Sequence, residues 1–337
     1  MARVVLVTGV SRGIGARFAR RLAADPAVDR VIGVDIAPPR RDLGDVSFVR
    51  ADIRNPVIAK VIAGEDVDTV VHLSVQASPG PGGRSSMKEH NVIGTMQLLA
   101  ACQRAPGVER LVVKSSSAVY GSSSRDPAMF TEEMGAKRLP RSGYAKDVLE
   151  VEGYVRGFAR RRPDVAVTLL RTANSVGPGV VSPLTGYFRL PVVPTVLGYD
   201  ARLMLLHEDD LLAVLRHSAL DGVHGTFNVA GDGVLMLSQA LRRLGRPTVP
   251  VPSVAFGPLA SATRQAGVKG LSPEMLAYLS FGRGLDTGRM RSVLGFSPSY
   301  TTAQAFASLA GALTPGLLTL PPAAPFTAAV DREVARG

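Results

Sequence analysis

The sequence predicts an α/β fold, a doubly wound parallel sheet followed by a smaller, mostly helical C-terminal lobe. The chain opens with an apolar strand, Val4–Val7, that passes through a glycine-rich turn into an amphipathic helix. Five further apolar runs alternate with helical patterns up to residue 179, as strands and helices do in parallel sheets. Beyond residue 179 this alternation gives way to prolines and helical patterns. The three observations are typical of a Rossmann fold.

The opening turn has the chemistry of a dinucleotide-binding site. Gly9, Gly13 and Gly15 lie between the first strand and its helix. Glycines let the backbone approach a pyrophosphate, and the helix N-terminus offers free N–H groups and positive partial charge. We therefore expect this turn to bind the pyrophosphate of NADH or NADPH. The residues between the glycines that we expect to contribute are Ser11, Arg12 and Ile14.

The sequence leaves the choice between NADH and NADPH open. A second strand, 31–35, ends in Asp35, where a carboxylate usually accepts hydrogen bonds from the adenosine ribose and favours NADH. Arg12, Arg40 and Arg41 favour NADPH instead, because a guanidinium can bind its 2′-phosphate through two hydrogen bonds. Arg40 and Arg41 fit a solvated loop equally well. We expect usable binding of both cofactors.

The later elements continue the alternation. Further strands are expected at 46–53, 68–74, from 110 into a serine cluster at 115–117, and at 165–170. We expect His72, in the fourth strand, to be a packed core histidine rather than a ligand. The Pro- and Gly-rich stretch 78–86 is either a lid or a surface loop. After residue 179, helices are expected near 208–220, 236–244, 272–280 and 302–312.

These patterns divide the chain into two lobes and a tail. The expected dinucleotide-binding lobe comprises residues 1–179 and 206–230. The expected substrate lobe comprises residues 180–205 and 231–313, and residues 314–337 are expected to form an extended tail.

The composition describes a soluble, globular and cytoplasmic chain. Its 337 residues are 46% hydrophobic and 20% charged, and no apolar run is long enough to cross a membrane. Cys102 is the only cysteine, which suits a reducing compartment. The net charge of +11 is scattered, so we expect it to attract a phosphorylated cofactor rather than nucleic acid. The histidines lack metal-ligand spacing, so no metal is expected, and a homodimer is left open.

A series of motifs runs through residues 3–310. Beside the glycine turn and Asp35, they are Asp52-Ile-Arg, Val71-His-Leu, Asn91-Val-Ile-Gly-Thr95, Ser115-Ser-Ser-Ala-Val-Tyr-Gly121, Tyr144, Arg171-Thr-Ala-Asn174, His207-Glu-Asp-Asp210, Phe227-Asn-Val and Leu294-Gly-Phe-Ser-Pro298. In this order, the motifs resemble the extended short-chain dehydrogenase/reductase family of nucleotide-sugar epimerases and dehydratases.

The resemblance implies roles for the matched positions. Residues that it places around the cofactor are Asp52 and Ile53 at the adenine, and Leu73, Ser74, Val75, Asn91, Tyr144, Arg171, Thr172, Ala173 and Asn174 elsewhere along the dinucleotide. Ser116 occupies the family's catalytic serine or threonine position, and Tyr144 its catalytic tyrosine position. Residues expected at the substrate are Gln76, Ser116, Ser117, Asn174, Tyr187 and Phe188.

The catalytic pattern departs from that family. A lysine is expected four residues after the tyrosine, where its charge lowers the tyrosine pKa, but Val148 stands there. Lys146 cannot replace it in a regular helix, because two residues at about 100° each put it on the opposite side. Tyr144 and Ser116 are therefore expected to assist only, and Tyr144 fits a packing or ribose-binding role as well.

Other departures argue against sugar chemistry. Ser117 and Ala118 replace the acid pair of the dehydratases, and Leu203 stands where an arginine usually binds the nucleotide phosphate. The Arg-Pro-Gly-Asp stretch that the family usually has before Asp286 is missing. Residues 249–281 are rich in apolar side chains instead. UDP- and TDP-sugars are therefore expected to bind poorly, and a large, flat, apolar ligand to bind better.

The function predicted from these residues is an NAD(P)H-dependent ketoreductase that reduces a carbonyl of an aromatic polyketide. Because the lysine is absent, a phenol of the substrate itself is expected to assist the reduction. Two alternatives remain: a nucleotide-sugar 4-epimerase-like oxidoreductase, and a catalytically silent dinucleotide-binding protein.

Overall fold

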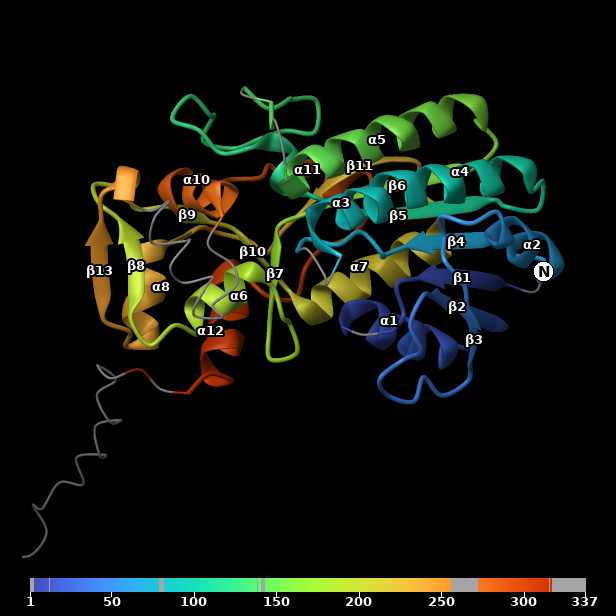
Figure 1. Cartoon of the computed structure of the whole chain (residues 1–337), viewed down its shortest axis with the longest axis horizontal. Helices are drawn as coiled ribbons and strands as arrows, with labels where there is room; N and C mark the ends of the chain where they lie inside the picture. Colours follow the sequence, from blue (N-terminus) through green and yellow to red (C-terminus); the bar gives the residue numbers. More distant parts are fainter. Residues whose placement is uncertain are drawn as a thin grey trace, which may run out of the picture.

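The structure is a computed structural model that describes residues 3–11, 13–78, 82–137, 139–140, 143–255, 272–314 and 316. Figure 1 shows a larger lobe built around a sheet and a smaller lobe of short helices and strands beside it. Some predictions lie outside the described residues. They concern Arg12, residues 79–81 of the suggested lid, the apolar stretch 256–271, and all of the tail except residues 314 and 316.

Within the described ranges, the central sheet has seven strands in the order β11-β6-β5-β4-β1-β2-β3, and every neighbouring pair is parallel. The strands are β1 Val4–Thr8, β2 Arg30–Asp35, β3 Val46–Arg50, β4 Thr69–His72, β5 Arg110–Ser116, β6 Ala166–Thr172 and β11 Gly225–Val229. The strand order reverses at β1, and ligands bind at the carboxyl ends of parallel strands beside such a point. The predicted doubly wound sheet is confirmed.

Helices cover both faces of this sheet. Helices α1 Gly13–Ala23 and α7 Glu208–Asp221 cover one face, and α2 Val57–Gly64, α4 Gly94–Arg104 and α5 Gly143–Arg161 cover the other. Alternate residues of β1 face the two layers, since Val5 and Val7 pack with α1 while Val4 and Leu6 pack with α2 and α4. A strand buried on both faces is continuously apolar, as the β1 sequence is.

The smaller lobe has its own core. Its helices are α6 Pro183–Phe188, α8 Leu237–Leu244, α10 Pro273–Phe281 and α12 Thr302–Gly311. Its strands are β8 Val193–Val196, β9 Arg202–Leu203, β12 Leu235–Met236, β13 Thr248–Val251 and β14 Gly282–Arg283. The strands add to the helices that the sequence predicted, because elements of two to four residues are too short to show a strand period. Phe188 packs edge-to-face on Phe306, with ring centroids 5.1 Å apart.

Two short strands join the lobes. Strand β7 Asn174–Val176 follows β6 and pairs with β10 Leu205–His207, which leads directly into α7. The remaining elements are α3 Gly83–Lys88, the π-helical turn η1 Glu89–Ile93, the 3₁₀ turns η2 Ser117–Tyr120 and η3 Ser253–Ala255, and α11 Gly288–Ser292.

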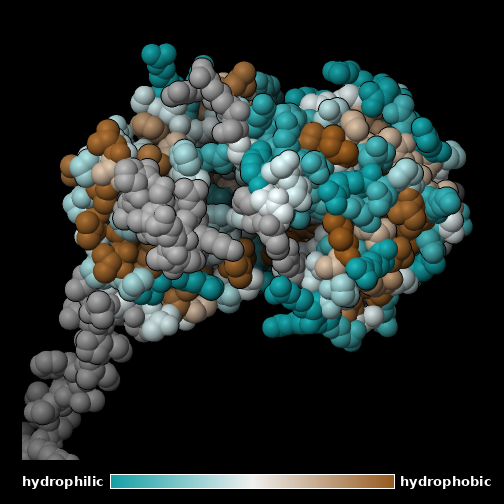
Figure 2. All heavy atoms as spheres, in the orientation of Figure 1, coloured by the Kyte–Doolittle hydropathy of each residue, from teal (hydrophilic) through white to brown (hydrophobic). Residues whose placement is uncertain are grey.

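The surface of the smaller lobe carries hydrophobic residues along its outer edge, as Figure 2 shows. Exposed apolar side chains near β8 and β13 include Leu197, Val249 and Val254. None of the helices in the described ranges is long and apolar enough to cross a bilayer.

Candidate functional site

The glycine turn has the geometry that a pyrophosphate requires. Gly9 and Gly13 have φ angles of +82° and +61°, which favour glycine. A Cβ added at Gly9 would lie 2.9 Å from Ser74 Cα, and one added at Gly15 would lie 2.0 Å from the Gly9 oxygen. A Cβ at Gly13 would meet nothing within 4 Å, so open space lies in front of the α1 N-terminus. The turn therefore fits the dinucleotide that the sequence predicted.

Asp35 lies at the carboxyl end of β2, beside this turn. Its carboxylate accepts a hydrogen bond from the Ser11 backbone N–H at 2.9 Å and one from the Ile36 N–H at 2.8 Å. The Arg40 backbone N–H donates to the Ser11 oxygen at 3.1 Å, which brings the 40–41 segment to the same turn. A carboxylate that favours NADH and an arginine segment that favours NADPH thus lie beside the same turn. Usable binding of both NADH and NADPH remains a prediction.

At the predicted adenine position, the backbone rather than the side chains is free to contact a ligand. The Asp52 carboxylate accepts hydrogen bonds from Arg54, the shortest at 2.6 Å from Nη2. Ile53 is buried, and a Cβ added at Gly94 would lie 2.9 Å from its side chain.

Asn91 holds the loop after β4 in place. It accepts from the Gln76 backbone N–H at 2.8 Å and donates to the Gln76 oxygen at 3.0 Å. Asn91 belongs to the π-helical turn η1, and such turns are frequent at functional sites. The loop that it fixes contains Leu73, Ser74 and Val75, which the sequence placed beside the cofactor.

His72 is a core residue, as predicted. Its two ring nitrogens lie 2.8 Å from the hydroxyls of Thr8 and Thr95. Burial lowers its pKa to about 3, so the ring is neutral near pH 7.

Ser116 and Tyr144 come together, but Val148 stands where the family's lysine would accompany them on α5. The side chains of Ser116 and Tyr144 share a hydrogen bond at the carboxyl end of β5. Burial raises the pKa of the Tyr144 hydroxyl to about 12. Val148 is buried in the core, and the Lys146 ammonium lies 3.9 Å from the Glu150 carboxylate. Tyr144 is therefore a neutral phenol at any pH near 7, a hydrogen-bond donor rather than a base.

The end of β6 and the two residues after it divide between the core of the larger lobe and a contact with the smaller lobe. The Arg171 guanidinium is buried, donates to Glu152 at 2.8 Å and lies 2.9 Å from the Tyr120 hydroxyl. Thr172 and Ala173 are buried as well, so these three residues have only their backbone to offer a cofactor. Asn174 is half-buried, and its side chain shares a hydrogen bond with Tyr278 of α10. Asn174 is thus the residue of this segment whose side chain reaches the second lobe.

Two substrate predictions need correction. Tyr187 is buried, and its hydroxyl donates a hydrogen bond to the Pro194 oxygen at 2.9 Å. Phe188, the last residue of α6, is completely buried against Phe306 of α12. Both side chains form the core of the smaller lobe. The sequence predicted them to contact the substrate, because aromatic residues in a loop-rich stretch occur both in hydrophobic cores and in binding pockets.

Sequence reasoning missed Arg283, which comes from β14 of the smaller lobe. Its guanidinium donates to the Gly121 oxygen, to Ser117 Oγ at 3.2 Å and to Ser122 Oγ at 3.0 Å. It lies 5.2 Å from the centre of the Tyr278 ring. The spacing to Asp286 is the signal that could have found it, because Arg283 stands three residues before that aspartate, as in the Arg-Pro-Gly-Asp stretch treated as missing.

The Arg283 guanidinium forms no direct ion pair with a described side chain, although the Asp126 and Glu274 carboxylates act on its charge from further away. Its hydrogen bonds go to uncharged oxygens and use three of its five N–H groups. Burial lowers its pKa, which means that its surroundings disfavour the cation. A half-buried guanidinium with free donors, between Ser117 and Tyr278, is suited to bind an anion.

Lys114 is a second residue that the sequence analysis did not single out. It lies on β5 two residues before Ser116, so both side chains belong to the same face of the strand. In the described part of the chain, the structure records neither a hydrogen bond nor an ion pair for its ammonium. Burial lowers its pKa to about 8.

Helix α10 also approaches the first turn of α5. The Glu274 carboxylate accepts a hydrogen bond from the Tyr144 backbone N–H, and a Cβ added at Gly143 would collide with it. On the other side of that turn, Arg84 forms an ion pair with the fully buried Asp147 and donates to the Gly143 oxygen at 2.7 Å. Residues of both lobes therefore fix the helix end that carries Tyr144.

Comparison with known proteins agrees with this geometry. The chain is 52% identical to the uncharacterized protein Rv0501 of Mycobacterium tuberculosis over 309 residues, which cover 90% of this chain and 82% of that protein. It is 33% identical to UDP-glucose 4-epimerase 2 of Oryza sativa subsp. japonica over 191 residues, which cover 52% of this chain and 45% of the rice protein. Among solved structures, MoeE5 in complex with UDP-glucuronic acid and NAD has the same fold, with a TM-score of 0.71, 22% identity, and coverage of 92% of this chain and 98% of MoeE5.

The model of the NAD dependent epimerase/dehydratase family matches residues 5–189, more than half of the chain. That range contains the glycine turn, Asp35, Ser116 and Tyr144. The chain therefore belongs to the NAD dependent epimerase/dehydratase family and uses a nicotinamide adenine dinucleotide.

Proposed function

We propose that this chain is an NAD(P)H-dependent ketoreductase whose substrate carries a negatively charged group, with a nucleotide-diphosphate-linked keto sugar as the best candidate. The observation that carries the substrate class is the half-buried Arg283 guanidinium beside Ser117, which forms no direct ion pair with a described residue. The reaction class rests on the family and on the state of Tyr144.

The residues around Tyr144 favour reduction over oxidation. When bound, the cofactor supplies or accepts a hydride equivalent. Oxidising an alcohol requires a base for its proton, and a tyrosine with a pKa of about 12 and no neighbouring lysine is a poor one. Reducing a carbonyl adds a hydride to its carbon and a proton to its oxygen. The Ser116 and Tyr144 hydroxyls can both donate hydrogen bonds to that oxygen as its negative charge develops, and solvent water supplies the proton.

Arg283 changes the expected substrate class. The sequence analysis expected nucleotide sugars to bind poorly, because Leu203 replaces the arginine that usually binds their phosphate. Leu203 is buried, but its strand β9 pairs with β14, which carries Arg283, and the Arg283 guanidinium reaches Ser117 instead. A guanidinium with free N–H groups can bind a diphosphate through two hydrogen bonds. The rice relative is named a UDP-glucose 4-epimerase, and the structure of MoeE5 contains UDP-glucuronic acid. Both support this substrate class.

The test is a turnover assay with NADH and NADPH. We expect a UDP-4-keto sugar to be reduced, and the same ketone without its nucleotide to be reduced far more slowly. Epimerisation of UDP-glucose at ordinary enzyme rates would instead establish the epimerase alternative. Cofactor binding without turnover of any carbonyl would favour the silent dinucleotide-binding protein.

An aromatic polyketide remains a second candidate, in its most specific form the angucyclinone part of simocyclinone. The arrangement that favours it is the Arg283 guanidinium over the Tyr278 ring, because such a site also suits a flat phenolate. In that case the substrate phenol beside the ketone would assist the reduction. Reduction of an angucyclinone ketone, lost when the neighbouring phenol is methylated although the analogue still binds, would establish this candidate.

Cytoplasmic location, a homodimer, and the absence of nucleic-acid, membrane and metal partners remain proposals that accompany this function. They rest on the composition and on the scattered positive charge. Sedimentation of the purified protein tests the homodimer.

A further inference from the structure

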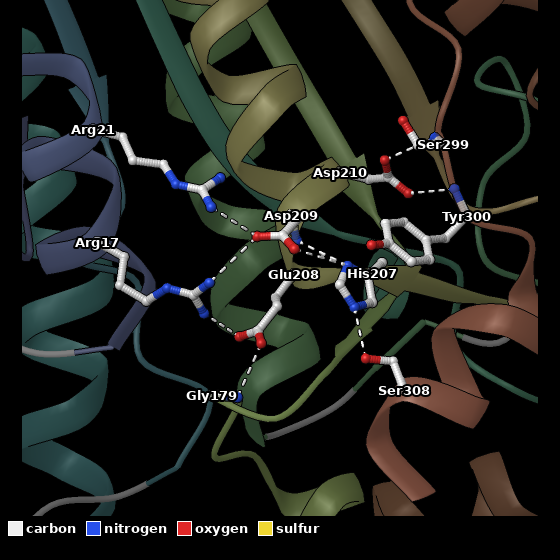
Figure 3. Close-up of polar contacts among 10 residues, drawn as sticks. All are labelled: Arg17, Arg21, Gly179, His207, Glu208, Asp209, Asp210, Ser299, Tyr300 and Ser308. Atoms are coloured by element: carbon white, nitrogen blue, oxygen red, sulfur yellow. Dashed lines mark hydrogen bonds and ion pairs between the residues drawn. The ribbon is translucent and has the colours of Figure 1, made fainter. Parts of the chain in front are cut away.

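The first residues of α7 tie four parts of the molecule together. Figure 3 shows that His207, the N-cap of α7, and the next residues Glu208, Asp209 and Asp210 reach different parts of the molecule, with Arg17 shared by Glu208 and Asp209. Residues at the start of a helix project in different directions at about 100° per residue, so four neighbours can reach four directions. The proposed function does not use this cluster.

Glu208 lies between the cofactor helix and the loop that leads to the smaller lobe. Its carboxylate forms an ion pair with Arg17 of α1 and accepts from the Gly179 backbone N–H at 2.9 Å. Only 5% of its side chain is exposed. Added Cβ atoms at Gly177 and Gly179 would come within 2.6 and 2.8 Å of the Glu208 side chain, so the loop is pressed directly against it.

Asp209 makes similar ion pairs at the surface. Its carboxylate lies 3.0 Å from Arg21 and 3.4 Å from Arg17, but 40% of its side chain is exposed and it does not contact the loop. Asp209 therefore shares the helix turn and the arginines of Glu208 without its connection to Gly179. It is a matched control for the loss of one carboxylate charge.

His207 and Asp210 attach the same turn to the smaller lobe. The His207 ring stacks on Tyr300, with centroids 3.8 Å apart, and its Nε2 lies 3.0 Å from Ser308 Oγ of α12. Asp210 accepts from the backbone N–H groups of Ser299 at 2.8 Å and Tyr300 at 3.0 Å. The turn is thus fixed to the smaller lobe while Glu208 faces the cofactor helix.

We propose that Glu208 is a positioning residue that transmits cofactor binding at α1 to the segment 174–179, which comprises β7 and the turn after it. Arg17 lies one helical turn after Gly13, where the pyrophosphate is expected, so a shift of the first turn of α1 moves the partner of Glu208. Gly179 follows Asn174 by five residues, and Asn174 shares a hydrogen bond with Tyr278 in the cleft. Glu208 therefore connects the cofactor end of the site to its substrate end. This role depends on the cofactor alone and not on the proposed substrate.

The test is hydrogen exchange of the backbone amides in peptides that span residues 174–188, with and without saturating NADH. In the wild-type protein and in Asp209→Asn, NADH should slow this exchange. In Glu208→Gln, which keeps the size of the side chain but removes the charge that binds Arg17, the NADH effect on 174–188 should be lost. Because coupling is reciprocal, the dissociation constant of NADH should also rise about 5-fold or more.

A second variant addresses the chance that Glu208→Gln simply loosens the fold. Gly179→Ala keeps both charges but places a methyl group 2.8 Å from Arg17 Nη1 and from Glu208 Oε2, so it should weaken the coupling at an unchanged melting temperature. An NADH effect that persists in Glu208→Gln, or one that Asp209→Asn loses equally, would overturn the inference. So would the absence of any NADH effect on 174–188 in the wild-type protein.

Discussion

Val148 stands one helical turn after Tyr144, where the family's lysine would lower the tyrosine pKa. Burial has the opposite effect and raises that pKa to about 12, so Tyr144 does not change protonation between pH 6 and 10. We expect kcat/KM to show no limb due to Tyr144 in this range. Tyr144→Phe should cost much less than the ~10²–10⁴-fold that removal of a general acid typically costs. A limb near pH 7–8 that disappears in Tyr144→Phe would contradict this assignment.

Lys114 predicts a specific pH dependence of stability. Its pKa is lowered by burial from 10.5 to about 8, so between these values the folded protein binds fewer protons than the unfolded chain, and stability rises with pH across the window. Near pH 7 the buried ammonium destabilises the fold. Lys114→Met should therefore stabilise it on the order of 1 kcal/mol at pH 7, and the gap to wild type should close by about pH 10. Urea unfolding at both pH values measures this, and a gap independent of pH would show that the ammonium is well solvated.

Whether the place of a single residue could be predicted from the sequence depended on how far along the chain its contact partners lie. Asp35, Ser116 and Tyr144 lie where local motifs placed them, because Asp35 and Ser116 end strands that the sequence marks and Tyr144 lies in the first turn of α5. Tyr187 and Phe188 turned out to be core residues, since burial against α12, more than 100 residues later, leaves no local signal. The sequence analysis missed Arg283 although Arg283 has the expected spacing to Asp286. The reason is that the residues between the two differ from those of the Arg-Pro-Gly-Asp stretch.

At the scale of elements, the pair Arg171–Glu152 links β6 to α5. Glu152 is completely buried and accepts from Arg171, from Ser115 Oγ at 2.6 Å and from Arg156 at 3.1 Å. Arg171→Met should destabilise the protein by about 3–5 kcal/mol, because it leaves a buried carboxylate without its main partner. Arg156 binds the same carboxylate with half of its side chain exposed, so Arg156→Met should cost about 1 kcal/mol or less. Equal losses in the two variants would contradict this ranking.

Elements with a clear period were predictable, and short ones were not. The strands of the central sheet other than β11, and the helices at 208–221, 237–244, 273–281 and 302–311, match their predicted positions closely. The strands β8, β9, β12, β13 and β14 had no such signal, because pairing between distant segments forms them. Arg283 lies on one of these strands, so its spacing to Asp286 could mark it in the sequence but its pairing beside Leu203 could not be predicted.

At the scale of the whole molecule, both lobes contribute residues to the proposed site. The larger lobe supplies the glycine turn, Asp35, Ser116 and Tyr144, and the smaller lobe supplies Arg283. The net charge of +11 adds a long-range attraction for anionic ligands that salt should screen. The central claim is therefore that an anionic part of the substrate binds at Arg283, next to a carbonyl site at Ser116 and Tyr144.

The most direct test is calorimetric titration of UDP into the NADH-loaded protein and into its Arg283→Gln variant. Glutamine keeps a hydrogen-bonding side chain without the charge, and a check of the unfolding midpoint shows whether the variant remains folded. We predict that UDP binds wild type about 10- to 100-fold more tightly than Arg283→Gln, since hydrogen bonds to charged groups contribute that much, while NADH affinity stays the same. Equal UDP affinity in the two proteins, or no UDP binding to wild type, would contradict the account.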